Sequence, residues 1–262
     1  MTEPLLRFVH ISDTHIHPDE NYTVHYAAYT PLKGLRPLLD AIDALPFTPD
    51  FVLHTGDVAY DPVPSAYAEV QMAFAHLRVP LYVLAGNHDD PAALASLYRE
   101  KSVRFNTEIN GVQLVGVDSN ASVPPPRGRV TEEDLEWLAQ ICRADDPRPL
   151  VLAVHHNPLP IGSPWMDEFM RITNGEALHA ALFPARQRLR GVFHGHIHQN
   201  LDVMRDGILY SAAASSWCQF HSYTQASHTD VVSAREELPG FSVVSIYPQQ
   251  TVIRRHFYQP EP

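Results

Sequence analysis

Residues 5–15, LLRFVHISDTH, join a short apolar run to a polar ending. The apolar, β-branched run Leu5–Ser12 predicts a buried first strand, and the chain then turns polar at Asp13 and His15. The same arrangement, an apolar run that stops at aspartate, asparagine or histidine, recurs four times. It recurs at Gly56-Asp57, Gly86-Asn87-His88-Asp89, His155-His156 and His194-Gly195-His196-Ile197-His198. These five strand ends carry the predictions about both fold and site.

The first half of the chain alternates strands with helices. Phe51–Thr55 predicts a second strand, between two segments with helical apolar spacing, Gly34–Leu45 and Ser65–Leu77. Pro46 ends the first of these helices, and Ser65 is expected to cap the second. Leu81–Ala85 predicts a third strand, which ends at Gly86. This alternation predicts a parallel sheet with helices outside it.

The second half adds antiparallel strands. Turn dipeptides at Asn110-Gly111 and Asp206-Gly207 predict hairpins, and Thr131 followed by Asp134 predicts a capped helix. Asn157–Asn174 is expected to be a long connection. Further strands are predicted at Val103–Ile109, Val112–Val117, Leu150–His155, Gly191–His194, Gly240–Tyr247 and Thr251–Tyr258. No repeat or linker interrupts the pattern, so residues 1–262 are expected to form one α/β domain.

Composition excludes several classes of protein. With 45% hydrophobic and 19% charged residues, the 262-residue chain is globular in composition. No apolar run approaches the roughly 20 residues that cross a bilayer, and no secretory signal is visible at the N-terminus. The two cysteines, Cys142 and Cys218, fit a reducing cytoplasm. The formal net charge of −11 disfavours nucleic-acid polymers and anionic membranes as partners.

The residue types at the five strand ends suit a divalent metal. Carboxyl ends of parallel strands converge on one crevice in open α/β sheets, and imidazole and carboxylate ligands bind first-row metals. In extended backbone Asp13 and His15 would point to the same side and chelate one ion, and His196 and His198 share that spacing. One carboxylate, such as that of Asp57, can bridge two ions. Each motif alone is weak, but their conjunction indicates a two-metal centre.

Taken in order, D-x-H, G-D, G-N-H-D, H-H and G-H-x-H resemble the calcineurin-like metallophosphoesterase superfamily. The resemblance is closer to one branch, the class III cyclic nucleotide phosphodiesterases, with the bacterial cAMP phosphodiesterase and its glycerophosphodiesterase relatives. Residues 155–174, HHNPLPIGSPWMDEFMRITN, are similar to the segment of that branch after its double histidine. Trp217–Phe220 and Leu238–Phe241 resemble its C-terminal part.

The resemblance implies a four-layer α/β/β/α sandwich of two mixed sheets and a site for two divalent ions, manganese, iron, zinc or cobalt. His88 would face the scissile phosphate without binding metal. His155 is favoured over His156 as a ligand because it lies at the strand end. Whether Asp61 orients His88 stays open. The first ion would be held by Asp13, His15, Asp57 and His198, and the second by Asp57, Asn87, His155 and His196.

The function expected from these features is hydrolysis of a small phosphodiester, with a 3′,5′-cyclic nucleotide as the leading candidate. A hydroxide that bridges the metals would attack phosphorus in line with the leaving oxygen, and His88 would assist the leaving group. Beside Asn87 and His88, the substrate pocket is expected to include Trp165, Asn174, Trp217 and His221. His54 or His194 would contact ligand carboxylates, with a purely structural role equally compatible.

Three other functions compete with this one. A glycerophosphodiesterase or a broad phosphomonoesterase would use the same chemistry. A non-catalytic metal-bound scaffold would keep the fold, but every ligand position and His88 hold competent residue types here. A nuclease that acts on DNA is disfavoured by the acidic charge and the lack of a basic patch. The branch is often dimeric, so a homodimer is a further expectation.

Overall fold

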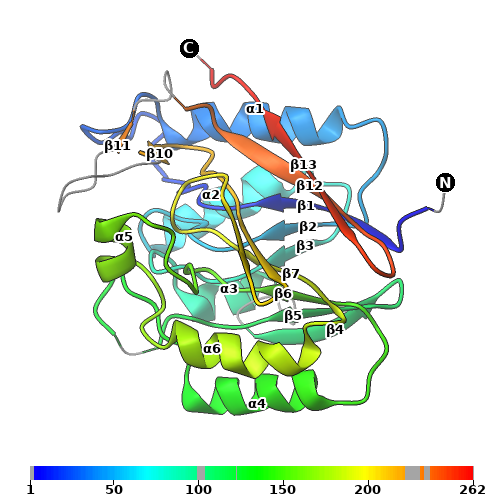
Figure 1. Ribbon diagram of the computed structural model, residues 1–262. Helices are drawn as coiled ribbons and strands as arrows, with labels where there is room; N and C mark the ends of the chain where they lie inside the picture. Colours follow the sequence, from blue (N-terminus) through cyan, green and yellow to red (C-terminus); the bar gives the residue numbers. More distant parts are fainter. Residues whose placement is uncertain (1–2, 99–103, 122, 222–230, 233–236, 262) are drawn as a thin grey trace.

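The computed structural model describes residues 3–98, 104–121, 123–221, 231–232 and 237–261. In that part of the chain two mixed β-sheets pack face to face, and helices cover the outer face of each sheet (Figure 1). The predicted four-layer α/β/β/α sandwich is confirmed. No helix in these described ranges combines the length and the apolar character needed to span a bilayer.

The first sheet has five strands in the order β13-β12-β1-β2-β3. Its three parallel strands are β1 (Leu6–Ile11), β2 (Phe51–His54) and β3 (Leu81–Val83). The antiparallel strands β12 (Gly240–Ile246) and β13 (Thr251–Phe257) extend the sheet beside β1. Its outer face packs against α1 (Pro31–Asp43), α2 (Pro64–Phe74) and α3 (Pro91–Tyr98).

The second sheet has six strands in the order β4-β5-β6-β7-β9-β8. Strands β5, β6, β7 and β9 run parallel, and the hairpin partners β4 and β8 close its edges. Helices α4 (Glu132–Arg143) and α6 (Gly175–Leu182) cover its outer face. The strands are β4 (Phe105–Ile109), β5 (Val112–Gly116), β6 (Leu150–Ala153), β7 (Leu189–His194), β8 (Asp202–Arg205) and β9 (Ile208–Ala212). Residue 103, predicted to belong to β4, lies outside the described residues.

Aromatic side chains hold the two sheets together. Phe8 of β1 stacks on Phe51 of β2 with ring centroids 4.9 Å apart, and Phe193 of β7 meets Phe8 edge-on at 5.2 Å. All three rings are fully buried. Each buried aromatic removes on the order of 150–250 Å² from water, so this layer fixes the distance between the strand ends of the two sheets.

Two helix starts differ from prediction because proline sets them. α1 begins at Pro31 and runs through Pro37. Pro37 has no amide proton for the carbonyl of Lys33, and that carbonyl accepts a hydrogen bond from the Glu261 amide instead, at 2.9 Å. α2 begins at Pro64, so Ser65 lies inside the helix and not at its cap. Proline is favoured in a first turn because no helical bond is lost there.

Other local predictions had mixed outcomes. Thr131 caps α4, accepting a hydrogen bond from the Asp134 amide at 3.0 Å, and both predicted hairpin turns adopt positive φ angles. The expected long connection at Asn157–Asn174 is wrong in one respect, because it contains the helix α5 (Pro164–Phe169). A small pair of strands, β10 (Gln219–Phe220) and β11 (Val231–Val232), was not predicted.

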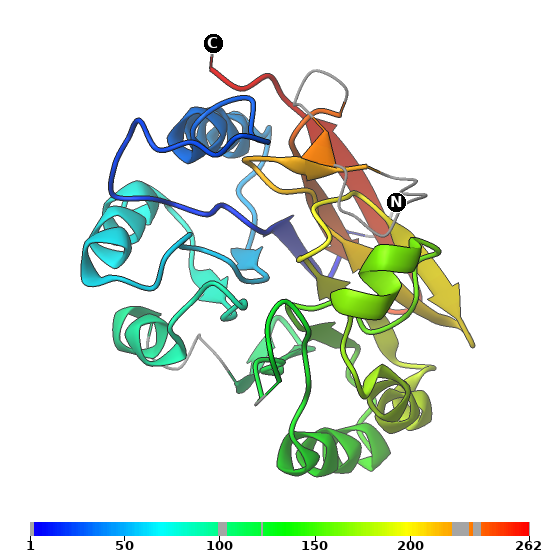
Figure 2. The ribbon, with the colours of Figure 1, turned by 90° about the vertical axis from the view of Figure 1, so that its left-hand side faces the viewer.

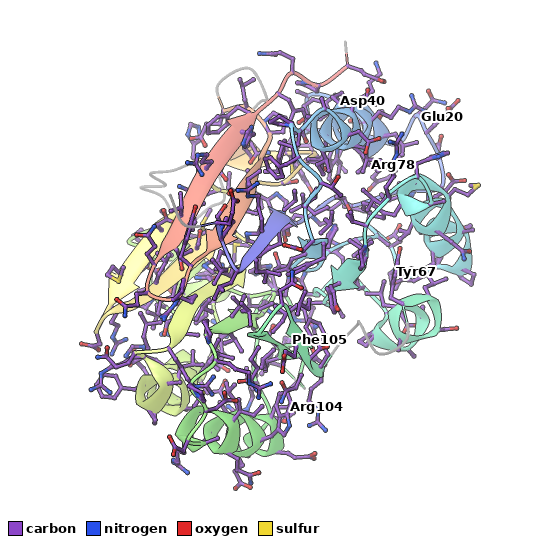
Figure 3. The ribbon with its side chains drawn as sticks, turned by 90° about the vertical axis from the view of Figure 1, so that its right-hand side faces the viewer. Glu20, Asp40, Tyr67, Arg78, Arg104 and Phe105 are labelled. Carbon is purple, nitrogen blue, oxygen red and sulfur yellow. The ribbon has the colours of Figure 1, made fainter. Side chains whose placement is uncertain are left out.

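Side-chain contacts tie the outer helices to the sheets. Arg104, which immediately precedes β4, donates a hydrogen bond to Asp134 of α4 at 2.7 Å (Figure 3). Tyr67 of α2 accepts a hydrogen bond from the amide of Asp90, which lies at the start of α3 (Figure 3). The second contact fixes α3 close behind the strand end that carries Asn87 and His88.

Candidate metal centre

Loops from both sheets meet at one edge of the sandwich, where the parallel strands end (Figure 2). The loops after β1, β2 and β3 come from the first sheet, and those after β6 and β7 come from the second. The aspartates and histidines of the motifs after β1, β2, β6 and β7 are buried, whereas Asn87, His88 and Asp89 after β3 are half-buried. Buried histidine and aspartate are rare unless they are paired or bind a metal, so this edge is the candidate site.

Asp13, His15 and His198 form the first group of metal-competent side chains, with ligand atoms all within 4.8 Å of one another. The Nε2 atom of His198 lies 3.3 Å from Asp13 Oδ1 and 3.2 Å from His15 Nε2. Two imidazole nitrogens at this separation share either one proton or one ion, and nitrogen ligands about 2.0–2.1 Å from a common ion fit it.

Asp57, Asn87 and His155 form the second group. His155 Nε2 lies 3.4 Å from Asp57 Oδ2 and 3.2 Å from Asn87 Oδ1. The same Asp57 oxygen lies 3.8 Å from His15 Nε2 in the first group. The carboxylate of Asp57 therefore stands between the two groups, which is the arrangement that a bridging ligand requires.

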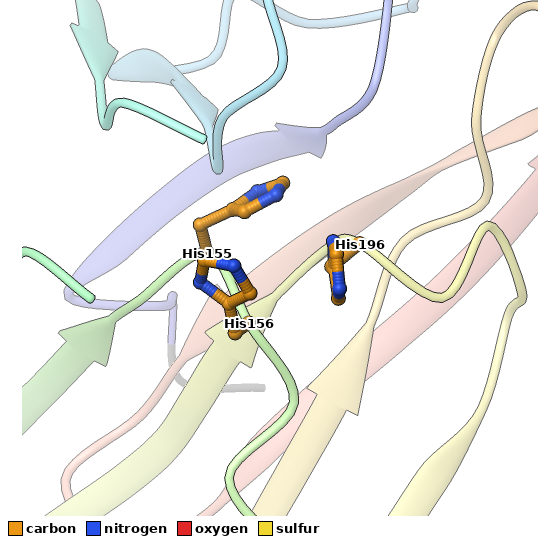
Figure 4. A group of neighbouring side chains, drawn as sticks. All are labelled: His155, His156 and His196. Atoms are coloured by element: carbon orange, nitrogen blue, oxygen red, sulfur yellow. The ribbon is translucent and has the colours of Figure 1, made fainter. Parts of the chain in front are cut away.

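His196 completes the cluster opposite the double histidine (Figure 4). Its ring centroid lies 4.9 Å from that of His155 and 4.4 Å from that of His156. The Nε2 atom of His196 is buried and has no hydrogen-bond partner within the described ranges. An unpaired buried nitrogen is costly, and a bound divalent cation is a partner that fits this set of nitrogen and oxygen donors.

The two adjacent histidines are held differently. His155 Nδ1 donates to the carbonyl of Thr55 at 2.7 Å, which leaves Nε2 directed at Asp57 and Asn87. His156 Nδ1 instead contacts the hydroxyl of Ser119 at 2.7 Å. Nε2 of His156 is also buried without a partner in the described part of the chain, and it groups with His155 and His196. A histidine ligand is commonly oriented by a carbonyl on its other nitrogen, and this feature favours His155, whose Nε2 reaches Asp57 and Asn87.

The backbone at the site is strained in a way that the sequence did not predict. Asp13, His15, Asp57, His196 and His198 all have positive φ angles, of 54°, 47°, 54°, 69° and 50°. Asp13 and His15 do lie in one metal-competent group, but the expectation that extended backbone brings them together is wrong, because both residues adopt left-handed backbone. Left-handed backbone at non-glycine residues costs on the order of 1–3 kcal/mol each and clusters at functional sites. This strain aims the side chains inward.

Glycine allows the loops at this edge of the sandwich to approach one another closely. A Cβ atom added to Gly86 would lie 2.1 Å from Asp57 Oδ1 and 2.4 Å from the Asp57 amide nitrogen.

We expect Gly86→Ala to displace Asp57, reduce bound metal and lower kcat/KM about 100-fold, since a shift near 1 Å has that effect. The control is Gly111→Ala in the β4–β5 turn, where φ is +76° and the new Cβ strains the backbone but meets nothing within 4 Å, so it measures the effect of a strained substitution that does not contact Asp57. Equal metal content in the two variants would contradict the prediction.

In the metal-free site the short distance between Asp57 and His155 shifts the pKa of both side chains. Burial alone would raise the pKa of Asp57, but the adjacent His155 holds it well below its usual value. Burial opposes protonation of His155, yet Asp57 raises the pKa of this histidine to about 9. Burial lowers the pKa of His15 to about 3, which keeps that imidazole in the neutral, metal-binding form. Metal binding must displace the proton from His155.

His88 is oriented by backbone and not by the Asp61 carboxylate. Its Nδ1 lies 2.7 Å from the carbonyl of Tyr60, and its amide donates to Asp57 Oδ1 at 2.9 Å. Asp61 lies beside His17 instead, with the nearest atoms 3.8 Å apart. Because a carbonyl only accepts hydrogen bonds, Nδ1 of His88 carries a proton, and Nε2 is the atom left to meet a substrate.

Asp89 has a role that sequence reasoning missed. Its carboxylate accepts hydrogen bonds from the amides of Val58, Ala59 and Gly86, at 2.9 to 3.1 Å. The contacts clamp the loop after β2 to the loop after β3, and so position Asp57 against Asn87. The signal was present in the sequence, because Asp89 is the last residue of the G-N-H-D motif.

His54 and His194 contact backbone and hydroxyl groups, not ligand carboxylates. Thr14 Oγ1 donates to the carbonyl of Val58 and therefore accepts from Nε2 of His54 at 3.0 Å. Nδ1 of His54 accepts from the amide of Gly56. Burial lowers the pKa of His54 to about 4, so its imidazole is neutral. Its hydrogen bonds connect the loop after β1 to the loop after β2. His194 Nδ1 contacts the carbonyl of Gly195 at 3.2 Å.

A cavity of about 360 Å³ opens onto the cluster. Of the predicted substrate residues, Asn87, His88, Trp165 and Trp217 line it. Asn174 does not: its side-chain amide bonds the backbone of Val130 through both ends. His221 is not part of the lining either. Residues that line the cavity without having been predicted for it include His25, Tyr26, Tyr60, Pro126, Met170, Cys218 and Phe220.

Comparison with known proteins agrees with this geometry. Residues 6–200 match the family model described as calcineurin-like phosphoesterase. The chain belongs to the calcineurin-like phosphoesterase family. The expected family is thus confirmed, and the chain is a metal-dependent phosphoric ester hydrolase.

Relatives within the family cover most of the chain. One is the 3′,5′-cyclic adenosine monophosphate phosphodiesterase CpdA of Vibrio vulnificus, 26% identical over 94% of this chain and 88% of that protein. Another is the glycerophosphodiester phosphodiesterase GpdQ of Enterobacter lignolyticus, 30% identical over 72% of this chain and 69% of that protein. Among solved structures, a dimetal phosphatase from Danio rerio has a TM-score of 0.74, with 14% identity and 97% of each chain covered. That likeness shows the shared fold.

Proposed function

We propose that this phosphoesterase hydrolyses small phosphodiesters with a pair of divalent ions, and that 3′,5′-cyclic nucleotides are its leading substrates. The observation that carries the proposal is the position of Asp57, whose one carboxylate oxygen lies near both His15 and His155. The names of the CpdA relatives, which span nearly the whole chain, support the cyclic nucleotide as substrate.

We assign the residues to the two ions in the way that the family resemblance implies. Bound there, the ions would neutralise phosphate oxygens and lower the pKa of a water to about 7 in favourable sites. His155 and His198 each present Nε2, because a carbonyl holds the Nδ1 of each. The first ion is assigned to Asp13, His15, Asp57 and His198, and the second to Asp57, Asn87, His155 and His196.

His88 is assigned to the substrate. Its Nδ1 proton is held by the Tyr60 carbonyl, so Nε2 can donate a hydrogen bond or proton to the leaving oxygen only when His88 is the doubly protonated imidazolium, which becomes neutral as the proton is transferred. Fixed orientation of such a group avoids reorganisation during the reaction, and general acid catalysis contributes about 10²–10⁴-fold.

The character of the cavity favours a small diester with an apolar organic part. Aromatic rings dominate the lining, and none of its members in the described part of the chain is a lysine or arginine. Among the described lining residues, the positive charge that meets the phosphate would come from the metal centre and His88, which suits a singly charged diester better than a doubly charged monoester. A nucleic-acid polymer would need a basic track, and the chain carries −11.

Glycerophosphodiesters remain the second candidate substrate, supported by the GpdQ relative. The aromatic lining favours a nucleotide over glycerol, because flat rings gain from stacking. A scaffold without activity is disfavoured by the intact ligand set and the oriented His88. A single domain, a homodimer and a cytoplasmic location remain predictions.

A substrate panel tests the proposal. Metal-stripped protein is reconstituted with manganese, iron, zinc or cobalt in turn, and turnover is measured on cAMP, glycerophosphoethanolamine and p-nitrophenyl phosphate. We expect cAMP to have the highest kcat/KM, and each activity to vanish without metal. A higher kcat/KM for glycerophosphoethanolamine would assign the second function instead, and one for p-nitrophenyl phosphate would make the chain a monoesterase.

A further inference from the structure

The cavity above the metal centre has two separate apolar walls. One wall, called here the Tyr60 wall, consists of Tyr26 and Tyr60 backed by Trp217, which belong to one hydrophobic cluster. The other, called the Trp165 wall, consists of Trp165, Met170 and Phe220, which belong to a different cluster. Because the clusters are distinct, each wall is a surface that one substituent of a diester can contact on its own.

The Tyr60 wall is built onto His88. The Tyr60 carbonyl binds His88 Nδ1 at 2.7 Å, and the Tyr60 ring lies 5.2 Å from the His88 ring, measured between centroids. Trp217 meets Tyr60 edge-on at 5.3 Å and is only 1% exposed. Its indole nitrogen donates to the carbonyl of Tyr29 at 2.8 Å. The wall is thus rigid, and Tyr26 and Tyr60 form its face.

The Trp165 wall is built onto a metal ligand at the other side of the site. Phe220 stacks on His198, with ring centroids 4.4 Å apart and planes 5° from parallel. His15 lies between His198 and His88, with ring centroids 5.1 Å and 4.9 Å away. His15 also lies beside Tyr60 and Trp217, with ring centroids 5.9 Å and 5.5 Å away. The Tyr60 wall therefore borders the imidazoles of His88 and His15, the Trp165 wall borders that of His198, and the phosphate would lie above these three rings.

Hydrolysis distinguishes the two substituents of a phosphodiester. The oxygen of water bonds to phosphorus, one ester P–O bond breaks, and the leaving oxygen keeps the electron pair and takes up a proton. His88 is the group placed to supply that proton. The leaving oxygen therefore lies at His88, and the substituent that it carries lies against whatever surrounds His88.

We infer that the Tyr60 wall is the subsite for the leaving alcohol and the Trp165 wall is the subsite for the substituent that stays on phosphorus. The assignment rests on the proposed diesterase function and on His88 as its proton donor. Both subsites are uncharged. Burial and the neighbouring Tyr60 raise the pKa of Tyr26, so its phenol stays neutral. The subsites therefore fit neutral aryl or nucleoside groups.

Three chromogenic diesters with the same leaving group separate the subsites. The substrates are bis(p-nitrophenyl) phosphate, thymidine 5′-(p-nitrophenyl) phosphate and methyl p-nitrophenyl phosphate. Each releases p-nitrophenolate, because no substituent in these diesters is a better leaving group. They differ in the retained group, which is aryl, nucleoside or methyl. The variants are Trp165→Ala and Tyr26→Ala, with Trp165→Phe as the conservative rescue and Phe257→Ala, an exposed residue outside the cavity lining, as the matched control.

Trp165→Ala is expected to lower kcat/KM about 10-fold for the aryl and nucleoside substrates, because stacking on a base contributes about 1–3 kcal/mol. The same variant should leave the methyl substrate within about twofold, and Trp165→Phe should restore most of the loss. Tyr26→Ala should lower kcat/KM for all three substrates by one common factor of about 3–10, since the leaving group is shared. Metal content and thermal unfolding of each variant show that site and fold persist.

The assignment depends on which of the two variants shows a loss of kcat/KM that varies with the retained group. Loss that is uniform in Trp165→Ala but dependent on the retained group in Tyr26→Ala would overturn it, and so would uniform loss in both variants. None of the substrates is cyclic, so failure to turn over cAMP leaves the test intact. Failure of the unaltered chain to hydrolyse any of the three would reject the diesterase function itself. That result differs from one in which the substrates are hydrolysed but the two variants do not show the expected difference.

Discussion

Asp57→Asn is expected to abolish metal-dependent hydrolysis, lowering kcat/KM by about 10³-fold or more. Metal ions supply several kcal/mol of transition-state stabilisation, and about 1.4 kcal/mol corresponds to tenfold in rate. Asparagine keeps the shape and the oxygen that accepts the His88 amide, but it removes the charge that both histidine groups face. Metal analysis by mass spectrometry and diester turnover provide the measurements.

The control for this variant is Asp61→Asn. Asp61 is the next acidic residue along the chain, its side chain is 54% exposed, and its carboxylate lies beside His17. Metal content and turnover should stay unchanged in this control, and both variants should keep the circular dichroism of the original chain. Full metal occupancy in Asp57→Asn would show that Asp57 does not bridge the two groups.

His88→Asn is expected to retain bound metal and lose about 10²–10⁴-fold in kcat, the usual contribution of a general acid. His88 does lie close to His15 and Asp57, with ligand atoms all within 4.8 Å. Its Nδ1 is nevertheless held by the Tyr60 carbonyl, so it serves the substrate. The loss should appear mainly in kcat, since a proton donor acts in the transition state.

The nature of the leaving group provides a check on this role. Diesters with acidic leaving groups such as p-nitrophenolate need little proton donation, so His88→Asn should affect them less than it affects alkyl diesters. Loss of metal from this variant would instead place His88 among the ligands. An equal loss for both kinds of leaving group would remove its role as a proton donor.

The polar residues at the strand ends were predictable because topology decides where they meet. Parallel strands bring their carboxyl ends to one edge, so Asp13, Asp57 and Asn87 had to converge once the first three strands were recognised. His155 and His198 come from the second sheet, and the aromatic layer between the sheets sets their distance from the first three. Only strand identity and order were needed for this part of the site.

The backbone conformation at the ligands was not predictable from pattern. Positive φ at Asp13 and His15 reflects tertiary constraint, because an isolated chain would avoid that region. The partner of His88 was hidden for a related reason: it is the carbonyl of Tyr60, and every residue has a carbonyl. Sequence reasoning looks for side-chain partners, so it could consider Asp61 for this role but left the question open.

The lining of the cavity was the least predictable part. Tyr26 lies in a loop without helical or strand periodicity, and its place beside Tyr60 depends on packing around the buried Trp217. Asn174 matched the family segment, but its amide is engaged by the backbone of Val130. Type and spacing of residues do not distinguish a side chain that faces a cavity from one that bonds the main chain.

Anomalous diffraction from crystals soaked in manganese tests the central claim most directly. We expect two peaks about 3.5–4 Å apart, one among Asp13, His15 and His198 and the other among Asn87, His155 and His196, with the Asp57 carboxylate between them. A single peak with Asp57 in contact on one side only, or two peaks that do not share Asp57, would contradict the account.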